Sequence, residues 1–329
     1  MRLELRLFGA PSLWLDSREV SAEVSGKGLG LLAYLALNAP ATVSRSKAAS
    51  LLWPDKTEEA SNYRLRHTLW ELRRTLADGG AAETAWLGAS DTHCWLSLDG
   101  DVTVDVLQFE RGAAEPAADR AALGAATALY RGDLLDGLDL RDAPLFDEWL
   151  LMERERWQLA YLDALWRLAR LQATAGDDAG AERTYQRLIA ADPLRERSYR
   201  GLMGLYHRRG ERAAALRTYQ QCARMLKQEM GIAPSAATEQ LRRLIVQDTP
   251  LPAAQELARA ADLLRRGRLA EAWAACQTVE AGAGDLATLN HAALLRAEIA
   301  LADGRPAESL DLIRAARQAL TGWFGHSLL

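Results

Sequence analysis

A repeat of 34 residues runs through the second half of the chain. The stretches GDDAGAERTY and GERAAALRTY begin at Gly176 and Gly210, and each places an alanine five residues and a tyrosine nine residues after its glycine. Weaker copies begin at Gly267 and Gly304. This period holds two helices and a turn, and the small residues let the helices cross closely. We therefore expect a stack of helix pairs with a groove on one side.

The helical pattern covers most of the chain beyond residue 105. Its period and its small residues are typical of tetratricopeptide (TPR) repeats. The spacing of apolar residues and the positions of glycine and proline predict helices over 106–114, 118–130, 145–175, 179–191, 194–209, 212–230, 236–247, 254–266, 270–281, 286–302 and 307–321.

The first hundred residues follow a different pattern. Apolar alternation and turn residues predict, in order, short strands over 3–8, 13–15 and 18–20, helices over 25–38, 44–53 and 57–77, and a hairpin over 84–97. Ser25 and Ser44 are the expected caps of the first two helices. A small sheet, three helices and a hairpin in this order predict a winged helix, which is a helix-turn-helix with a β wing.

The expected fold class is mainly α with a small β component: an N-terminal winged helix-turn-helix followed by an all-α TPR-like helical array. A chain of 329 residues is longer than one compact core usually organises. Junctions at LDGDVTVD and DTPLPA predict a winged-helix DNA-binding domain over 1–100, a TPR-like domain over 101–248 and additional TPR-like helices over 249–329.

The third predicted helix carries the strongest functional signal. Leucines at 65, 69, 72 and 76 form one buried stripe, and the opposite side holds Tyr63, His67, Trp70 and Arg74. A solvated helix back is the plain interpretation, but two aromatic side chains there, on a third helix before a hairpin, favour a helix that reads DNA. The candidate DNA-binding residues are Asn62, Tyr63, Arg64, Arg66, His67, Trp70, Arg73 and Arg74, with Lys27, Arg45 and His93 from neighbouring elements.

Charge limits how strongly this region attracts DNA. Residues 1–100 hold 11 Lys and Arg against 12 Asp and Glu, while residues 61–76 hold four Arg against one Glu. We therefore expect modest, strongly salt-dependent binding, which dimerisation or a partner nearby would strengthen.

Other classes of function have little support in the sequence. GKGLG at Gly26 lacks the spacing of a phosphate-binding loop, and neither the histidines nor the carboxylates form a catalytic or metal-binding pattern. The three scattered cysteines suit a reducing cytoplasm, and we find no signal peptide and no stretch long enough to span a membrane. We therefore expect a cytoplasmic non-enzyme that needs no cofactor and no metal and has no membrane partner.

Four stretches resemble bacterial transcriptional regulators that join an OmpR-type winged helix to a bacterial transcriptional activator domain, such as the Streptomyces regulators of antibiotic synthesis. KGLGLLAYLAL resembles the first helix of their DNA-binding domain, and LRHTLWELRRTL resembles their recognition helix. YRGDLLDGL followed by DEWLLMERERW resembles the start of the activator domain. The segment from ADPLRERSYRG to PSAATEQL resembles its TPR-like end, so the likeness covers about residues 1–248.

The resemblance implies sequence-specific binding to double-stranded DNA, usually at direct repeats, and recruitment of RNA polymerase. It assigns base or backbone contacts to Arg66, His67, Trp70, Arg73 and Arg74. Trp70-Glu71 departs from the family pattern, where a small polar residue is usually followed by Arg. We also expect a homo-oligomer, a dimer, and an effector, small molecule or protein, in the TPR-like groove. The alternative is a TPR-like interaction scaffold whose winged helix is a docking module with weak or no DNA binding.

Overall fold

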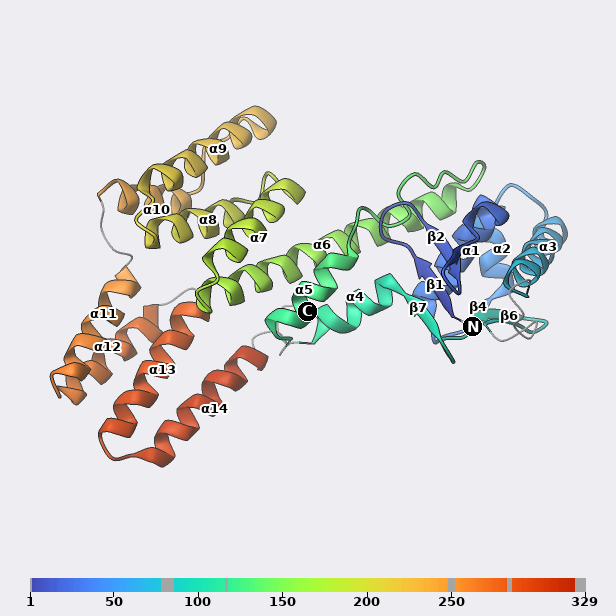
Figure 1. Ribbon diagram of the computed structural model, residues 1–329. Helices are drawn as coiled ribbons and strands as arrows, with labels where there is room; N and C mark the ends of the chain where they lie inside the picture. Colours follow the sequence, from blue (N-terminus) through green and yellow to red (C-terminus); the bar gives the residue numbers. More distant parts are fainter. Residues whose placement is uncertain (1, 78–85, 116–117, 248–251, 283–285, 323–329) are drawn as a thin grey trace. The chain divides into compact units, whose positions relative to one another are not determined.

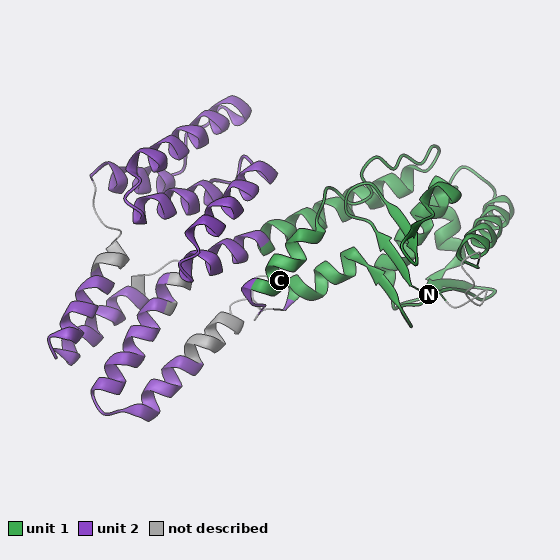
Figure 2. Cartoon of the chain, viewed as in Figure 1, with its two compact units in different colours: residues 1–114, 121–164 green, residues 115–120, 165–329 purple. Residues whose placement is uncertain are grey.

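The computed structural model describes residues 2–77, 86–115, 118–247, 252–282 and 286–322. The chain divides into two compact units, unit 1 with Met1–Ala114 and Ala121–Ala164, and unit 2 with Glu115–Arg120 and Leu165–Leu329 (Figures 1 and 2). The three domains expected over 1–100, 101–248 and 249–329 stay a prediction, because this division is coarser.

Unit 1 begins with a four-stranded sheet in the order β3-β2-β1-β7. Its strands are β1 (Leu3–Arg6), β2 (Ser12–Leu15), β3 (Arg18–Glu19) and β7 (Val102–Val104). Asp16 and Ser17 form the β2–β3 turn with positive φ angles of 44° and 74°, as a tight hairpin turn requires. β7 pairs in parallel with β1. It lies within residues 98–105, where the sequence analysis expected only a junction.

Three helices follow as predicted: α1 (Gly26–Asn38), α2 (Arg45–Leu52) and α3 (Glu58–Ala77). Ser25 caps α1, since its side chain accepts a hydrogen bond from the Gly28 amide at 3.2 Å. Ser44 occupies the N-cap position of α2 as expected, but its hydroxyl pairs with that of Ser46 at 2.7 Å and makes no capping hydrogen bond to a backbone amide. α3 begins one residue after Thr57, whose hydroxyl accepts from the Ala60 amide.

The predicted hairpin forms the wing. β5 (Leu87–Ala89) and β6 (His93–Leu96) are antiparallel, and β6 also pairs with the short strand β4 (Val43–Ser44) just before α2. Gly88 is required in β5, because a Cβ atom there would lie 2.2 Å from the Trp95 ring. The residues of the expected hairpin before position 86 lie outside the described part of the chain.

Unit 1 also contains helices from beyond residue 104: α4 (Asp105–Ala114), α5 (Arg120–Leu129) and the first two thirds of α6 (Pro144–Thr174). Phe8, just after β1, lies with its ring 5.5 Å from Phe109 and 6.0 Å from Trp157. The segment after α5 pairs with the same stretch, as the Leu135 amide donates to the Leu7 carbonyl at 2.8 Å. The sheet and these helices therefore share one core.

Unit 2 is a series of helix pairs: α7 (Asp178–Ala191), α8 (Glu196–Arg208), α9 (Arg212–Met230), α10 (Ala236–Val246), α11 (Pro252–Arg265), α12 (Leu269–Gly282), α13 (Leu286–Ala302) and α14 (Pro306–Gly322). Glycines at 176, 210, 267 and 304 lie in the turns that join α6 to α7, α8 to α9, α11 to α12 and α13 to α14. Their φ angles of 72–76° are a conformation that glycine adopts without strain. Five residues later, Ala181, Ala215 and Ala272 are fully buried and Ser309 is nearly so. The predicted fold class is confirmed, including the two weaker repeats.

Two further observations concern the described residues alone. None of their helices is both long and apolar enough to cross a membrane. No group of three or more His, Cys, Asp or Glu side chains among them is placed to hold a metal ion.

Candidate nucleic-acid interface

α3 has one buried and one exposed side. The four leucines of the predicted stripe are buried, with at most 5% of their surface exposed. On the opposite side Tyr63 is 63% and Trp70 56% exposed. Because burying an aromatic side chain of this size is favourable, two such residues in contact with water mark this side as a candidate contact surface.

Trp70 lies at the centre of a small cluster on this exposed side. The guanidinium carbon of Arg74 is 5.7 Å from the centre of the Trp70 ring, within cation–π distance. The His67 and Trp70 ring centres are 6.0 Å apart. Trp70 therefore presents its ring together with an arginine one turn further along the helix.

Glu71, the unexpected acid of this helix, has a partner on the same surface. Its Oε2 lies 3.5 Å from Nδ1 of His67 one turn earlier, and both side chains are about half exposed. A protonated His67 forms an ion pair with Glu71 and reduces the negative charge that this surface presents to a phosphate.

Arg73 contacts the hairpin. Its Nε donates a hydrogen bond to the Leu87 carbonyl of β5 at 3.2 Å, and the side chain is half-buried. This contact fixes the hairpin against α3. It also occupies one of the five donors of the guanidinium, so Arg73 is less free for DNA than the sequence suggested.

Lys27 also has an intramolecular role. Its Nζ donates to the Leu52 carbonyl at 2.6 Å, at the end of α2, and lies 5.3 Å from the centre of the Trp53 ring. Burial lowers its pKa from the usual value, with the nearby charges of Arg64 and Lys56 adding to the effect. Lys27 thus stabilises the helix-turn-helix, since a cation at a helix C-terminus is favourable.

Arg45 and His93 lie where β4 meets the hairpin. Arg45 Nη1 donates to the Ser90 carbonyl at 3.0 Å and its backbone amide to the Thr92 carbonyl. His93 is exposed, pairs with Ser44 across the sheet, and its Nδ1 lies 2.9 Å from the Thr92 hydroxyl. Both residues order the tip of the wing.

The remaining candidates lie along the start of α3. Arg64 and Arg66 are exposed and Asn62 is half-buried. Lys56, which was not among the residues predicted from the sequence, is exposed in the turn between α2 and α3. Its charge acts on Lys27 together with that of Arg64. Its position directly before the predicted recognition helix is the sequence signal that could have identified it.

A family model for the bacterial transcriptional activator domain matches residues 104–246, from the end of β7 to the end of α10. Residues 104–246 form a bacterial transcriptional activator domain. Its first helix, α4, and most of α6 lie in unit 1, in the same core as the sheet of the winged helix. The resemblance noted in the sequence is confirmed for this part of the chain.

Two known proteins are similar over longer stretches. The regulatory protein AfsR of Streptomyces coelicolor is 29% identical over 254 residues, which are 75% of this chain and 24% of AfsR. The chain therefore spans about a quarter of the length of that relative. The structure of Mycobacterium tuberculosis EmbR in complex with a low-affinity phosphopeptide superposes with a TM-score of 0.61 at 23% identity, covering 80% of this chain and 71% of EmbR. That likeness shows a shared fold.

Proposed function

We propose that this protein is a sequence-specific DNA-binding transcriptional regulator that activates transcription. One observation carries the proposal: the exposed side of α3 presents Tyr63, Trp70 and Arg74 to solvent, directly beside a hairpin. In a winged helix this helix enters the major groove and the hairpin lies near the backbone. The activator domain at 104–246 and the similarity to AfsR support the same class of function.

Each exposed residue of α3 has a chemically defined part in this proposal. Arg66 and Arg74 offer paired donors to guanine, and the ring of Trp70 offers an apolar surface to a thymine methyl group. Arg64 and Lys56 contact phosphates, which orient the helix without reading bases. Lys27, Arg45 and Arg73 act mainly by holding the helix-turn-helix and the wing in place.

A gel-shift assay with DNA from upstream of the protein's own gene, over a salt series, tests the proposal. We expect sequence-dependent retardation at low salt, with Arg66→Ala plus Arg74→Ala reducing it. Arg183→Ala plus Arg208→Ala, two exposed arginines outside the winged helix, removes the same charge and serves as the control. Equal retardation by wild type and by the α3 variant contradicts the proposal.

The helical remainder supplies the partners in this proposal. It provides a homodimer contact, a surface for RNA polymerase and, in the groove of the TPR-like array, a place for a small-molecule or protein effector. Stacked helix pairs form extended concave surfaces of this kind. Sedimentation velocity of the full chain tests dimerisation, and co-purification with RNA polymerase on promoter DNA tests recruitment.

A specific observation favours the alternative, an interaction scaffold. Three of the cationic candidates, Lys27, Arg45 and Arg73, donate to backbone carbonyls of the winged helix itself. These contacts leave the three cations less free to bind DNA phosphates. A pull-down that recovers a stable protein partner other than polymerase, together with no DNA binding at low salt, selects the scaffold.

A further inference from the structure

Charge is distributed very unevenly along the chain. Residues 101–164 hold 6 Lys and Arg against 14 Asp and Glu, whereas residues 165–246 hold 15 against 8. Residues 165–246 are therefore strongly basic, although the net charge of the whole chain is −4. This stretch comprises the end of α6 and helices α7 to α10, and lies outside the winged helix.

Many cations of the basic stretch are neutralised by neighbours. The ion pairs are Arg195–Asp192, Arg200–Glu196, Arg209–Glu182 and Arg242–Glu239. Arg197 lies over the Trp166 ring, and Arg212 donates to the Val246 carbonyl. The contacts of Arg209, Arg197 and Arg212 join different helices, and the other three pairs are local, three or four residues apart. Each of these cations therefore already has a neighbour within the chain.

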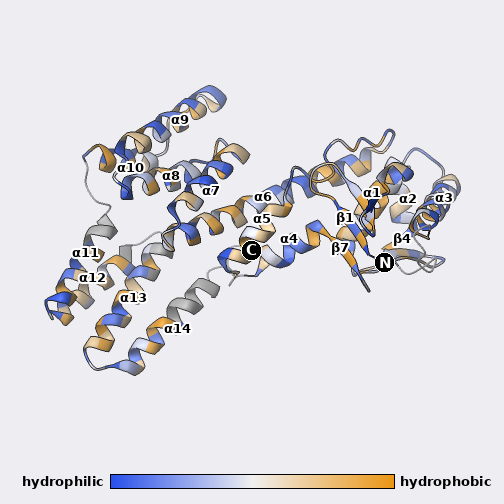
Figure 3. Cartoon of the chain, viewed as in Figure 1, coloured by the Kyte–Doolittle hydropathy of each residue, from blue (hydrophilic) through white to orange (hydrophobic). Residues whose placement is uncertain are grey.

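α9 is different, because its cations project from the side opposite its core. Ala215, Cys222 and Leu226 are buried against the neighbouring helices, and α9 lies beside α8 and α10. Six polar residues on the exposed side, here called the α9 stripe, are Arg217, Gln220, Gln221, Arg224, Lys227 and Gln228. These residues follow helical spacing and form one continuous ridge. Hydrophilic residues recur along α9 in Figure 3.

The α9 stripe contains hydrogen-bond donors and positive charge without an acid. Arg217, Arg224 and Lys227 form no ion pair with any described residue. The one acid within α9, Glu229, is exposed near the end of the helix, but helical spacing places it outside the stripe. Arg217 and Arg224 are separated by two helical turns, about 10 Å at ~1.5 Å per residue. That length allows the two ends of the stripe to meet different phosphates of one DNA strand.

We infer that the α9 stripe binds the sugar–phosphate backbone of duplex DNA, as a second contact that adds affinity without reading sequence. This inference rests on the proposed function, because the winged helix selects the site. Arg, Lys and Gln side chains are typical phosphate ligands. The winged helix alone is nearly neutral, so a basic surface elsewhere supplies the electrostatic attraction that it lacks.

An acidic protein surface is the competing partner, and residues 101–164 of a second copy have the matching charge. The composition of the α9 stripe argues against it. Protein interfaces have a core of aromatic and aliphatic side chains, and the stripe contains neither. DNA backbone recognition needs only donors and charge, which the stripe provides along its whole length.

The test replaces Arg217, Arg224 and Lys227 by glutamine in the full chain. All three side chains are exposed, so folding is preserved. The matched control replaces Arg259, Arg265 and Arg314, exposed arginines that pair with acids on their own helices, and removes the same charge. Binding is measured by fluorescence anisotropy over a salt series, on a duplex with the selected site and on a random duplex of equal length.

We expect the stripe variant to bind both duplexes more weakly, with a slope of log affinity against log salt that is shallower by about 2.7, or ~0.9 for each lost phosphate contact. The preference for the selected site stays unchanged, and the control keeps the wild-type slope. An unchanged slope on both duplexes overturns the inference. If the slope is unchanged but the stripe variant sediments as a smaller species than wild type, the inference is also overturned, and a second copy of the chain is the partner. If wild type binds both duplexes equally, the proposed function fails, while the slope on random DNA still tests the stripe.

Discussion

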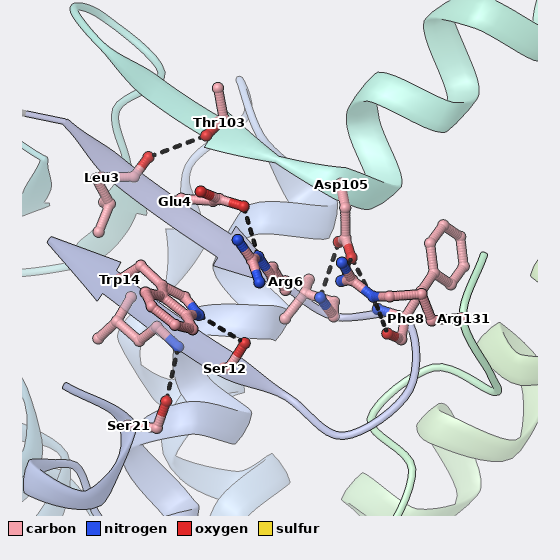
Figure 4. A network of polar contacts seen from close by, with 12 residues as sticks. Leu3, Glu4, Arg6, Phe8, Ser12, Trp14, Ser21, Thr103, Asp105 and Arg131 are labelled. Atoms are coloured by element: carbon pink, nitrogen blue, oxygen red, sulfur yellow. Dashed lines mark hydrogen bonds and ion pairs between the residues drawn. The ribbon is translucent and has the colours of Figure 1, made fainter. Parts of the chain in front are cut away.

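Arg131 Nη2 lies 2.8 Å from Asp105 Oδ2, and both side chains hold the stretch that follows β1 (Figure 4). Asp105 accepts hydrogen bonds from the Leu7 and Phe8 amides at 2.8 and 3.1 Å, and Arg131 Nε donates to the Phe8 carbonyl. Asp105 is the second residue of the activator domain, and Arg131 belongs to its YRGDLL segment. The activator domain is therefore anchored directly in the sheet of the winged helix.

Asp105→Ala is expected to lower the free energy of unfolding by about 3–5 kcal/mol, because it leaves buried amides and a guanidinium without their acceptor. The side chain of Asp105 is only 5% exposed. Urea denaturation followed by tryptophan fluorescence measures the effect, with the exposed Asp163→Ala as control. Equal stability of the two variants contradicts the assigned role of Asp105.

We expect the stability of unit 2 to depend on pH through Glu196. Burial raises its pKa, but hydrogen bonds from Thr238 and Ser235 outweigh burial and hold it below the ordinary value of 4.5. A lowered carboxyl pKa contributes stability that is present above pH 4.5 and is lost as pH falls through the folded-state value. Glu196→Gln should therefore cost about 2 kcal/mol at neutral pH, and the cost should shrink in acid. Urea denaturation of wild type and variant at neutral and at acidic pH checks this. The exposed Glu229→Gln is the control, and its effect on the free energy of unfolding should not depend on pH.

Trp70 and Arg73 are neighbours in space on α3 with opposite expected roles. Trp70→Ala should change the free energy of unfolding by less than about 0.5 kcal/mol, since the ring is 56% exposed. Its affinity for the selected DNA site should fall about tenfold or more, the size of one lost base contact.

Arg73→Ala should instead destabilise the winged helix by about 1 kcal/mol, through loss of the hydrogen bond to Leu87. Thermal unfolding and anisotropy on the same two proteins separate the effects. A Trp70→Ala protein that unfolds early and binds DNA normally reverses the assignment.

The three cysteines should be inert in the folded protein. Cys94, Cys222 and Cys276 are buried, and burial raises the pKa of Cys94 and brings those of Cys222 and Cys276 to about 11. The thiolate is the reactive form, so labelling with a chromogenic disulfide at mildly alkaline pH should be slow until urea is added. Rapid labelling of the native protein contradicts this burial.

The helices were predictable from sequence because local signals define them. The glycine at each repeat turn, with a small residue five positions later, located the helix pairs, and the predicted α6 differs from the observed helix by one residue at each end. The leucine stripe of α3 gave its buried side directly.

Contacts between distant segments were not predictable. β7 has only three residues, and its strand character depends on pairing with β1 about a hundred positions earlier. The hydrogen bonds of Lys27 to Leu52 and of Arg73 to Leu87 arise from tertiary packing. The sequence alone does not show these bonds, so both residues were predicted to contact DNA. For the candidate site, the sequence therefore identified the surface, and the structure separated its exposed residues from those that support it.

The central claim is that the exposed side of α3 reads DNA. An unbiased selection of genomic fragments bound by wild type, and by a variant with Arg66→Ala and Trp70→Ala, tests it most directly. We predict that wild type enriches a recurrent sequence and that the variant, still folded, loses this enrichment. Absence of any enriched sequence for wild type, or enrichment of the same sequence by the variant, contradicts the claim.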